Sequence, residues 1–140
     1  MVDFSQALGQ SYQQVLQDFP MLQQELINED LELGISNYYL TTSDHSIECT
    51  LDDLGNVSSI FVQFERGAPS VFDIHSQSSI ASLLARFGEP IAKGRGRRSD
   101  VFGQIGGWVK FDAGGTFIHL EFTPGEPRIK MMTLMTHNVR

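Results

Sequence analysis

His119 and Glu121 are the two side chains whose type and spacing come closest to a chemical site in this 140-residue sequence. They alternate with apolar residues along a run typical of a β-strand, so both should lie on one face, about 7 Å apart. Such a pair could bind a metal ion or exchange a proton, but a third metal ligand is not evident. A solvated sheet face is the simpler interpretation. An enzymatic or small-ligand domain using His119 and Glu121 stays an alternative, and it requires a concave pocket that joins them.

Cys49 is the only cysteine, which excludes an intrachain disulfide and a cysteine-rich zinc site. It stands in an alternating run, where neighbouring side chains point to opposite faces. We therefore expect Cys49 to be a small buried core residue and Glu48 to point away from it. This opposition argues against a catalytic group made of His45, Glu48 and Cys49.

Asp52 and Asp53 are adjacent carboxylates whose side chains should diverge, so they form a poor acid–base pair. With Gly55 close behind, they have the composition of a turn, in which short carboxylates accept hydrogen bonds from nearby amides. No Gly-x-Ser-x-Gly motif of a nucleophilic serine occurs either. The sequence therefore predicts a protein that is not an enzyme, with no catalytic residue, metal ion or cofactor.

Charge is distributed unevenly along the chain. Residues 1–65 contain eleven Asp and Glu and no Lys or Arg, whereas residues 66–140 contain ten Lys and Arg and six Asp and Glu, giving −7 overall. A one-sided acidic segment speeds encounter with a cationic protein partner and repels nucleic acid and anionic membranes. An equally simple interpretation is that the acidity only favours solubility.

Residues 93–98 read Lys-Gly-Arg-Gly-Arg-Arg within the stretch 91–107, which we expect to be a functional or mobile loop. A Gly-rich cationic loop can grip phosphates, but this one lacks interleaved aromatic residues. Because the chain is acidic as well, we expect it to bind neither nucleic acid nor membranes. The loop is more simply explained as a neutralising partner for the acidic half or for an acidic patch on a second copy, which leaves a homodimer open.

Hydrophobic periodicity divides the chain into helices and strands. Apolar residues recur every three or four positions over 4–19, which predicts a helix that Pro20 interrupts. The apolar residues of 21–27 predict a second helical stretch, or a continuation of the first helix after a kink. A further helix should follow Ser79 and end at Gly88. Elsewhere the period is two, which predicts strands over 37–41, 46–51, 57–65, 108–112, 116–122 and 128–136.

These elements predict a single α+β domain over residues 1–140, with N-terminal helices and one central helix packed on an antiparallel, mostly meander sheet of about five to six strands. A composition of 41% hydrophobic and 19% charged residues is typical of globular proteins. The longest apolar runs are far shorter than the roughly 20 residues of a membrane span. The first ten residues lack the basic and apolar regions of a signal peptide, so a cytoplasmic location is expected.

Between residues 45 and 135 the chain has a predicted helix that ends in Phe-Gly-Glu-Pro, a Gly-rich loop, and the predicted strands Trp-Val-Lys-Phe-Asp, Thr-Phe-Ile-His-Leu-Glu-Phe and Met-Thr-Leu-Met. This pattern of turns and strands resembles that of small bacterial immunity proteins, the partners of polymorphic or contact-dependent toxins. A similar arrangement occurs in the lactamase-inhibitor and outer-membrane assembly lipoprotein folds, whose members carry a signal peptide.

Immunity proteins bind a cognate toxin domain and block its active site, so the resemblance implies a toxin-neutralising function and a tight one-to-one complex. A cationic toxin domain, for example a nuclease, would suit the acidic half. The resemblance transfers no functional residue. An acidic secretion chaperone of the type III kind is a further alternative, since that class is also small and α+β. The predicted partner contacts, chosen from charge and from strand alternation, are Tyr38, Asp44, Glu48, Asp52, Asp53 and Glu65.

Overall fold

The computed structural model describes residues 3–30, 35–95, 97–99 and 103–136, with side chains described for all of these except 27–30, 35–37, 97–99 and 103–105. Strands dominate this part of the chain, and its helices are short. In chain order the elements are η1 (Phe4–Ala7), α1 (Tyr12–Asp18), β1 (Gln23–Asp30), β2 (Ile35–Thr41), β3 (Ile47–Leu51), β4 (Val57–Gln63), η2 (Phe64–Arg66), α2 (Ile80–Phe87), β5 (Ala92–Gly94), β6 (Arg97–Ser99), β7 (Gly103–Ile105), β8 (Trp108–Asp112), β9 (Thr116–Phe122) and β10 (Ile129–Thr136).

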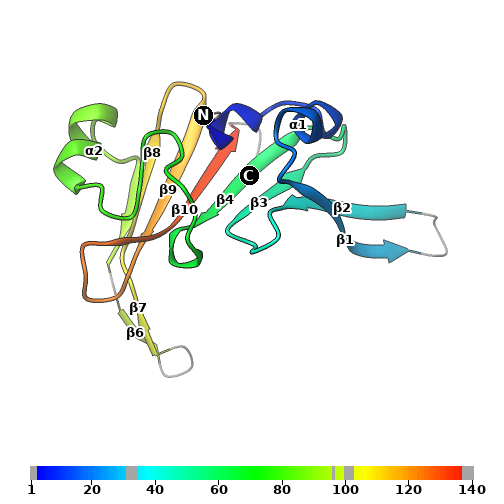
Figure 1. Ribbon diagram of the computed structural model, residues 1–140. Coiled ribbons are helices and arrows are strands. Elements are labelled where there is room, and N and C mark those ends of the chain that lie inside the picture. Colours follow the sequence, from blue (N-terminus) through cyan, green and yellow to red (C-terminus); the bar gives the residue numbers. More distant parts are fainter. Residues whose placement is uncertain (1–2, 31–34, 96, 100–102, 137–140) are drawn as a thin grey trace.

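Eight strands form one antiparallel sheet in the order β1-β2-β3-β4-β10-β9-β8-β5, and β6 pairs with β7 in a separate two-stranded ribbon. The last strand, β10, lies between β4 and β9 and joins the two halves of the chain (Figure 1). Every strand of one half of the sheet comes from before residue 64, and every strand of the other half comes from after residue 91. The first half runs in chain order from β1 to β4, and the second half runs in reverse order from β10 to β5.

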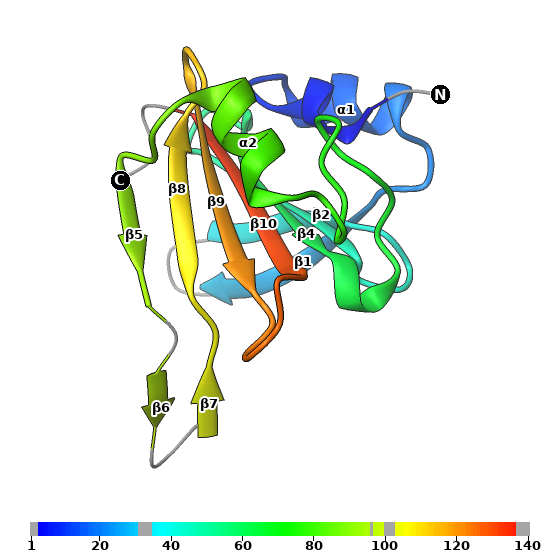
Figure 2. The ribbon, with the colours of Figure 1, turned by 90° about the vertical axis from the view of Figure 1, so that its left-hand side faces the viewer.

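The helices cover one face of this sheet (Figure 2). α1 begins where the Ser11 side chain accepts a hydrogen bond from the Gln14 amide, and α2 begins in the same way at Ser79. Their apolar sides, together with η1 and the segment before α2, pack on the apolar residues of the central strands. Each side chain buried in this layer contributes about 1.5–3 kcal/mol through the hydrophobic effect. The core includes Phe4, Val15, Phe19, Val71, Ile74, Leu83, Leu40, Cys49, Ile60, Phe111, Ile118 and Leu134.

The expected fold of several helices on five to six strands is wrong, because the chain is mainly an eight-stranded antiparallel sheet with two short α-helices in its described part. In the stretch 21–27, expected to be helical, residues 23–27 belong to β1 (Gln23–Asp30), which pairs with β2. The expected loop over 91–107 contains three short strands, of which β5 extends the main sheet by pairing with β8. The helix ending at Gly88 and the hairpin of β3 and β4 are confirmed.

The sheet twists so strongly that β1 and β2 run across the direction of β8 and β9 (Figure 2). The β1–β2 hairpin and the β6–β7 ribbon extend from the body as two separate arms (Figure 1). Among the described helices none is long and apolar enough to cross a membrane. The two arms and the helix-free side of the sheet are the features of this fold that could position a site.

Candidate functional site: the open face of the sheet

The face of the sheet opposite the helices, here called the open face, carries three rows of side chains set by strand register. No helix of the described chain lies over it (Figure 2). From β8 toward β1, the first row is Trp108, Glu121, Met131 and Gln63; the second is Lys110, His119, Thr133, Phe61, Glu48 and Thr41; the third is Asp112, Phe117, Met135, Ser59, Thr50, Tyr39 and Glu25.

The centre of the open face is apolar. Phe61, Phe117, Met131 and Met135 are all partly exposed there, while the small Thr133 between them is buried. A partly exposed set of aromatic and methionine side chains is typical of the centre of a protein–protein interface. This arrangement suits contact with another apolar surface better than it suits bound water.

At the β8 end of the open face, the Trp108 and His119 rings stack with their centroids 5.2 Å apart and their planes 21° apart. Lys110 lies beside them, with its Nζ 4.6 Å from the centre of the Phe117 ring. Burial lowers the pKa of His119 below its ordinary value of 6.5, and Lys110 adds to this effect while Glu121 opposes it. His119 is therefore a neutral stacking partner at pH 7 and not a charged ligand.

At the β1 end, Tyr39 lies between two carboxylates. Its hydroxyl donates a 2.9 Å hydrogen bond to Glu25 Oε2. That hydrogen bond raises the pKa of Tyr39 above 10.0, and desolvation and the negative charges of Glu25 and Glu48 act in the same direction. Glu48 also contacts His45, with Nδ1 and Oε1 3.3 Å apart and both side chains 37% exposed. The two carboxylates therefore share one local electrostatic environment that solvent and a partner can reach.

The turn between β2 and β3 holds His45 beside Glu48. The Asp44 carboxylate accepts hydrogen bonds from the Thr42 hydroxyl at 2.8 Å and from the Ser46 amide at 3.0 Å. These bonds, led by the one from the Ser46 amide, lower the pKa of Asp44 to about 2. His45 takes a positive φ of 59° in this turn, and its Nδ1 lies 3.2 Å from Thr41 Oγ1. Asp44 thus has a structural role in positioning the histidine.

The six predicted contact residues do not share one surface. Glu48 lies on the open face, and Asp44 lies in the turn next to it. Tyr38 is 40% exposed, but it points to the opposite face from Glu48. Glu65 lies on η2. Asp52 and Asp53 occupy the turn at the opposite end of β3 from Asp44, and the five residues of β3 span about 17 Å at ordinary strand rise.

Asp52 is a turn residue, as the sequence indicated. Its Oδ1 atom accepts 2.9 Å hydrogen bonds from the amides of Leu54 and Asn56. Cys49 is fully buried, and burial raises the pKa of its thiol to about 12, which makes it unreactive at pH 7. Among the described residues no three His, Cys, Asp or Glu side chains are placed to hold a metal ion.

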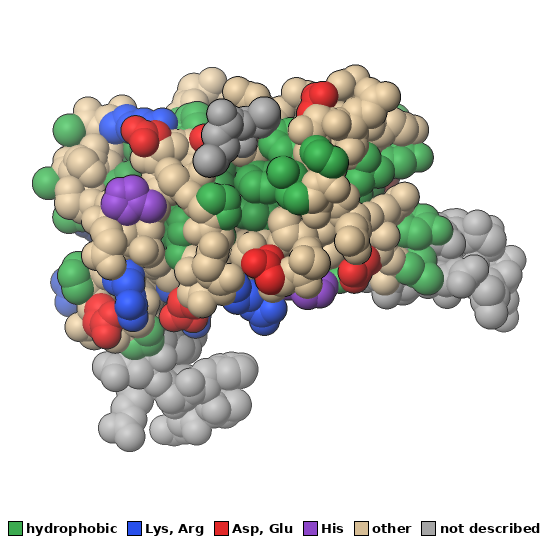
Figure 3. All heavy atoms as spheres, in the orientation of Figure 1, with side chains coloured by type: hydrophobic (Ala, Val, Ile, Leu, Met, Phe, Trp, Pro, Cys, Tyr) green, Lys and Arg blue, Asp and Glu red, His purple; other side chains and the backbone are tan. Residues whose placement is uncertain are grey.

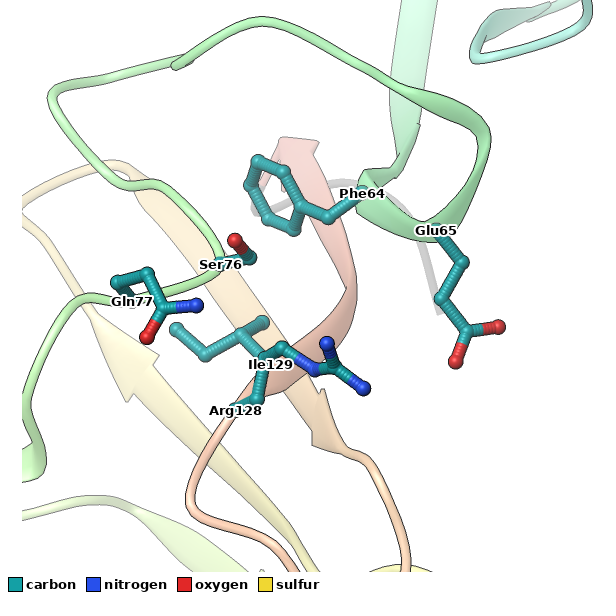
Figure 4. Close-up of a pocket in the computed structure, with 6 residues that line it drawn as sticks. All are labelled: Phe64, Glu65, Ser76, Gln77, Arg128 and Ile129. Atoms are coloured by element: carbon teal, nitrogen blue, oxygen red, sulfur yellow. The ribbon is translucent and has the colours of Figure 1, made fainter.

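A shallow cavity of about 330 Å³ lies between η2, the segment before α2 and the start of β10 (Figure 4). Glu65 and Arg128 stand on its two sides, and Phe64 and Ile129 supply apolar walls. Arg128 Nη2 already lies 2.9 Å from Glu126 Oε2, so the charge of Arg128 is partly neutralised. The cavity is not lined by His119 or Glu121, and so it does not supply the pocket that an enzymatic use of that pair would require.

The two halves of the sheet differ in charge. In Figure 3 the acidic side chains are scattered over the visible face, and the part toward the β1–β2 arm shows no Lys or Arg. The basic segment 93–98 begins on β5, at the opposite edge of the sheet from β1. β5 therefore lies away from the acidic β1–β2 hairpin.

Sequence reasoning missed most of the open face. Alternation in β9 did place His119 and Glu121 on one side, but a helical interpretation of 21–27 hid the strand position of Glu25. The available signal for this face was the spacing of Ser59 and Phe61, which lie two residues apart and therefore on the same side of one strand.

Comparisons of the chain with family models, with curated proteins and with solved structures return no match.

Proposed function

We propose that this protein is a binding module that neutralises a partner protein by covering its functional surface, in the manner of a toxin-immunity protein. The observation that carries the proposal is the open face, where an apolar centre of aromatic and methionine side chains has no covering helix in the described chain. Burying such a surface against a partner releases bound water and favours association.

The surroundings of the side chains that could take part in a reaction favour binding over catalysis. His119 is stacked on Trp108, Cys49 is buried with a raised pKa, and Asp44 and Asp52 are occupied in turns. A general acid–base site needs a titratable group within reach of a substrate in a pocket. No histidine or cysteine lines the described cavity at Glu65 and Arg128.

Co-expression with each protein encoded beside this chain, after a screen for one that arrests growth and so acts as a toxin, tests the proposal. The wild-type chain should relieve the growth arrest that the toxin causes. Met135→Asp, which places a charge in the apolar centre, should abolish protection, because an unpaired buried carboxylate opposes complex formation. Leu54→Asp is the matched control, because Leu54 is 85% exposed in the β3–β4 turn and away from the open face.

Circular dichroism and a Kd measured with the purified toxin domain separate misfolding from lost binding. Met135→Ala provides a milder second variant, expected to weaken binding about 5- to 30-fold if Met135 is a central contact. No protection by the wild-type chain would refute the immunity function. Full protection by a folded Met135→Asp chain would refute use of the open face.

A further inference from the structure

The charge asymmetry of the sequence is a spatial asymmetry of the sheet. The segment that forms β1 to β4, residues 23–63, contains eight Asp and Glu and no Lys or Arg. The segment that forms β5 to β10, residues 92–136, contains seven Lys and Arg and four Asp and Glu. Because these segments occupy opposite halves of the sheet, the β1 end is negative and the β5 end is positive.

The open face joins this negative end to its apolar centre. Glu25 and Tyr39 are direct neighbours across β1 and β2, and Glu48 lies diagonally across on β3. From there the second row continues through Phe61 toward the centre of the face. A partner that covers the centre and extends along the face toward β1 therefore also covers two carboxylates and a tyrosine.

We propose that the partner protein docks on the open face with an arginine side chain over Tyr39, between Glu25 and Glu48. The proposal rests on the proposed binding function and names the chemistry of the partner. Charge complementarity selects a cation at this end, since no Lys or Arg of the first 65 residues can neutralise the two carboxylates. A guanidinium fits better than an ammonium, because its planar donors bind carboxylates in pairs and its face stacks on aromatic rings.

His45 and Tyr39 each contact one of the two carboxylates: His45 Nδ1 lies near Glu48 Oε1, and the Tyr39 hydroxyl donates to Glu25 Oε2. A carboxylate has two oxygens that together accept about four hydrogen bonds, so a guanidinium can join these contacts. The His45–Glu48 contact is partly exposed, so an arginine can join it without breaking a buried ion pair. The complex should therefore form fastest at low salt and lose affinity as salt screens the carboxylates.

Hexa-arginine, hexa-lysine and hexa-glutamate peptides, added to the full chain at low ionic strength, test the docking chemistry. Backbone amide shifts should move in β1, β2 and β3, with hexa-arginine bound more tightly than hexa-lysine and hexa-glutamate not bound. Glu25→Gln and Glu48→Gln keep the shape of each side chain and remove its charge. Each should weaken hexa-arginine about two- to fivefold, the usual range for a partly exposed ion pair.

Asp53→Asn is the matched control, because it removes one negative charge from the turn at the far end of β3. It should change the affinity for hexa-arginine by less than either Gln variant. Equal affinity of Glu25→Gln, Glu48→Gln and wild type would overturn the proposal, and so would amide shifts centred on the β3–β4 turn. Failure of toxin neutralisation with intact hexa-arginine binding would refute the immunity function alone.

Discussion

Gly106 is the position where one added methyl group should disturb the fold most. A Cβ at this residue would overlap the carbonyl oxygen of Phe122, and it would lie 2.8 Å from the carbonyl carbon, where 3.4 Å is the lower limit of ordinary contact. The end of β9 must therefore shift, because both obstructing atoms belong to the backbone. Gly106→Ala thus forces strand β9 away from the segment that leads into β8.

The expected loss of stability follows from two terms. Overpacking of a well-packed site destabilises by about 1–3 kcal/mol. The same movement strains the hydrogen bond from the Phe122 amide to the Gly107 carbonyl, 2.9 Å long, whose loss would add about 1 kcal/mol. Gly106→Ala should therefore lower the free energy of unfolding by about 2–4 kcal/mol.

Urea denaturation followed by circular dichroism measures this change. Gly67→Ala is the control, because Gly67 has a positive φ of 86° but open space around it, so Ala there brings backbone strain of about 1 kcal/mol and no clash. The emission of Trp108, the only tryptophan, should shift in Gly106→Ala because Trp108 pairs with Glu121 beside Phe122. A Gly106→Ala protein as stable as Gly67→Ala would refute the steric argument.

Three further predictions concern titrating groups. Cys49, with a pKa of about 12, should resist alkylation at pH 8 in the folded protein and react once urea is added, as mass spectrometry would show. The Asp44 pKa of about 2 should stabilise the fold above pH 4, and this contribution should disappear as pH falls toward 2. Asp44→Asn should therefore flatten the stability profile between pH 4 and 2; an unchanged profile would contradict the assignment. The lowered pKa of His119 means that the unfolded chain binds its proton more readily, so stability should fall as pH drops below 6.5. NMR titration of the ring checks the direction, and His119→Phe should remove this pH dependence.

Local signals were sufficient wherever a short segment specifies its own structure. α2 was predictable because Ser79 caps its first turn and Gly88, with φ of 80°, ends it. The β3–β4 hairpin was predictable because alternation flanks a turn that contains Asp52 and Gly55. In these elements, capping, turn chemistry and hydrophobic period agree without help from distant residues.

Tertiary pairing overrode local preference in the segments that were interpreted wrongly. Residues 21–27 contain apolar residues at a helical spacing, but pairing with β2 fixes residues 23–27 in the edge strand β1. Glycine and basic residues gave 91–107 the composition of a loop, although Ala92 to Gly94 pair with β8. Strand pairing joins residues far apart in sequence, and a local sequence pattern does not specify which distant strand will pair with it.

The sequence by itself determined the acidic first half, the basic second half, the absence of paired cysteines and the alternation of each later strand. Only the tertiary structure decided that β10 lies between β4 and β9, and that the helices cover one face alone. That order converts a charge difference along the chain into a charge difference across the sheet. It also brings Glu25, Tyr39 and Glu48 together, because register across three strands, not spacing within one, sets which side chains are neighbours.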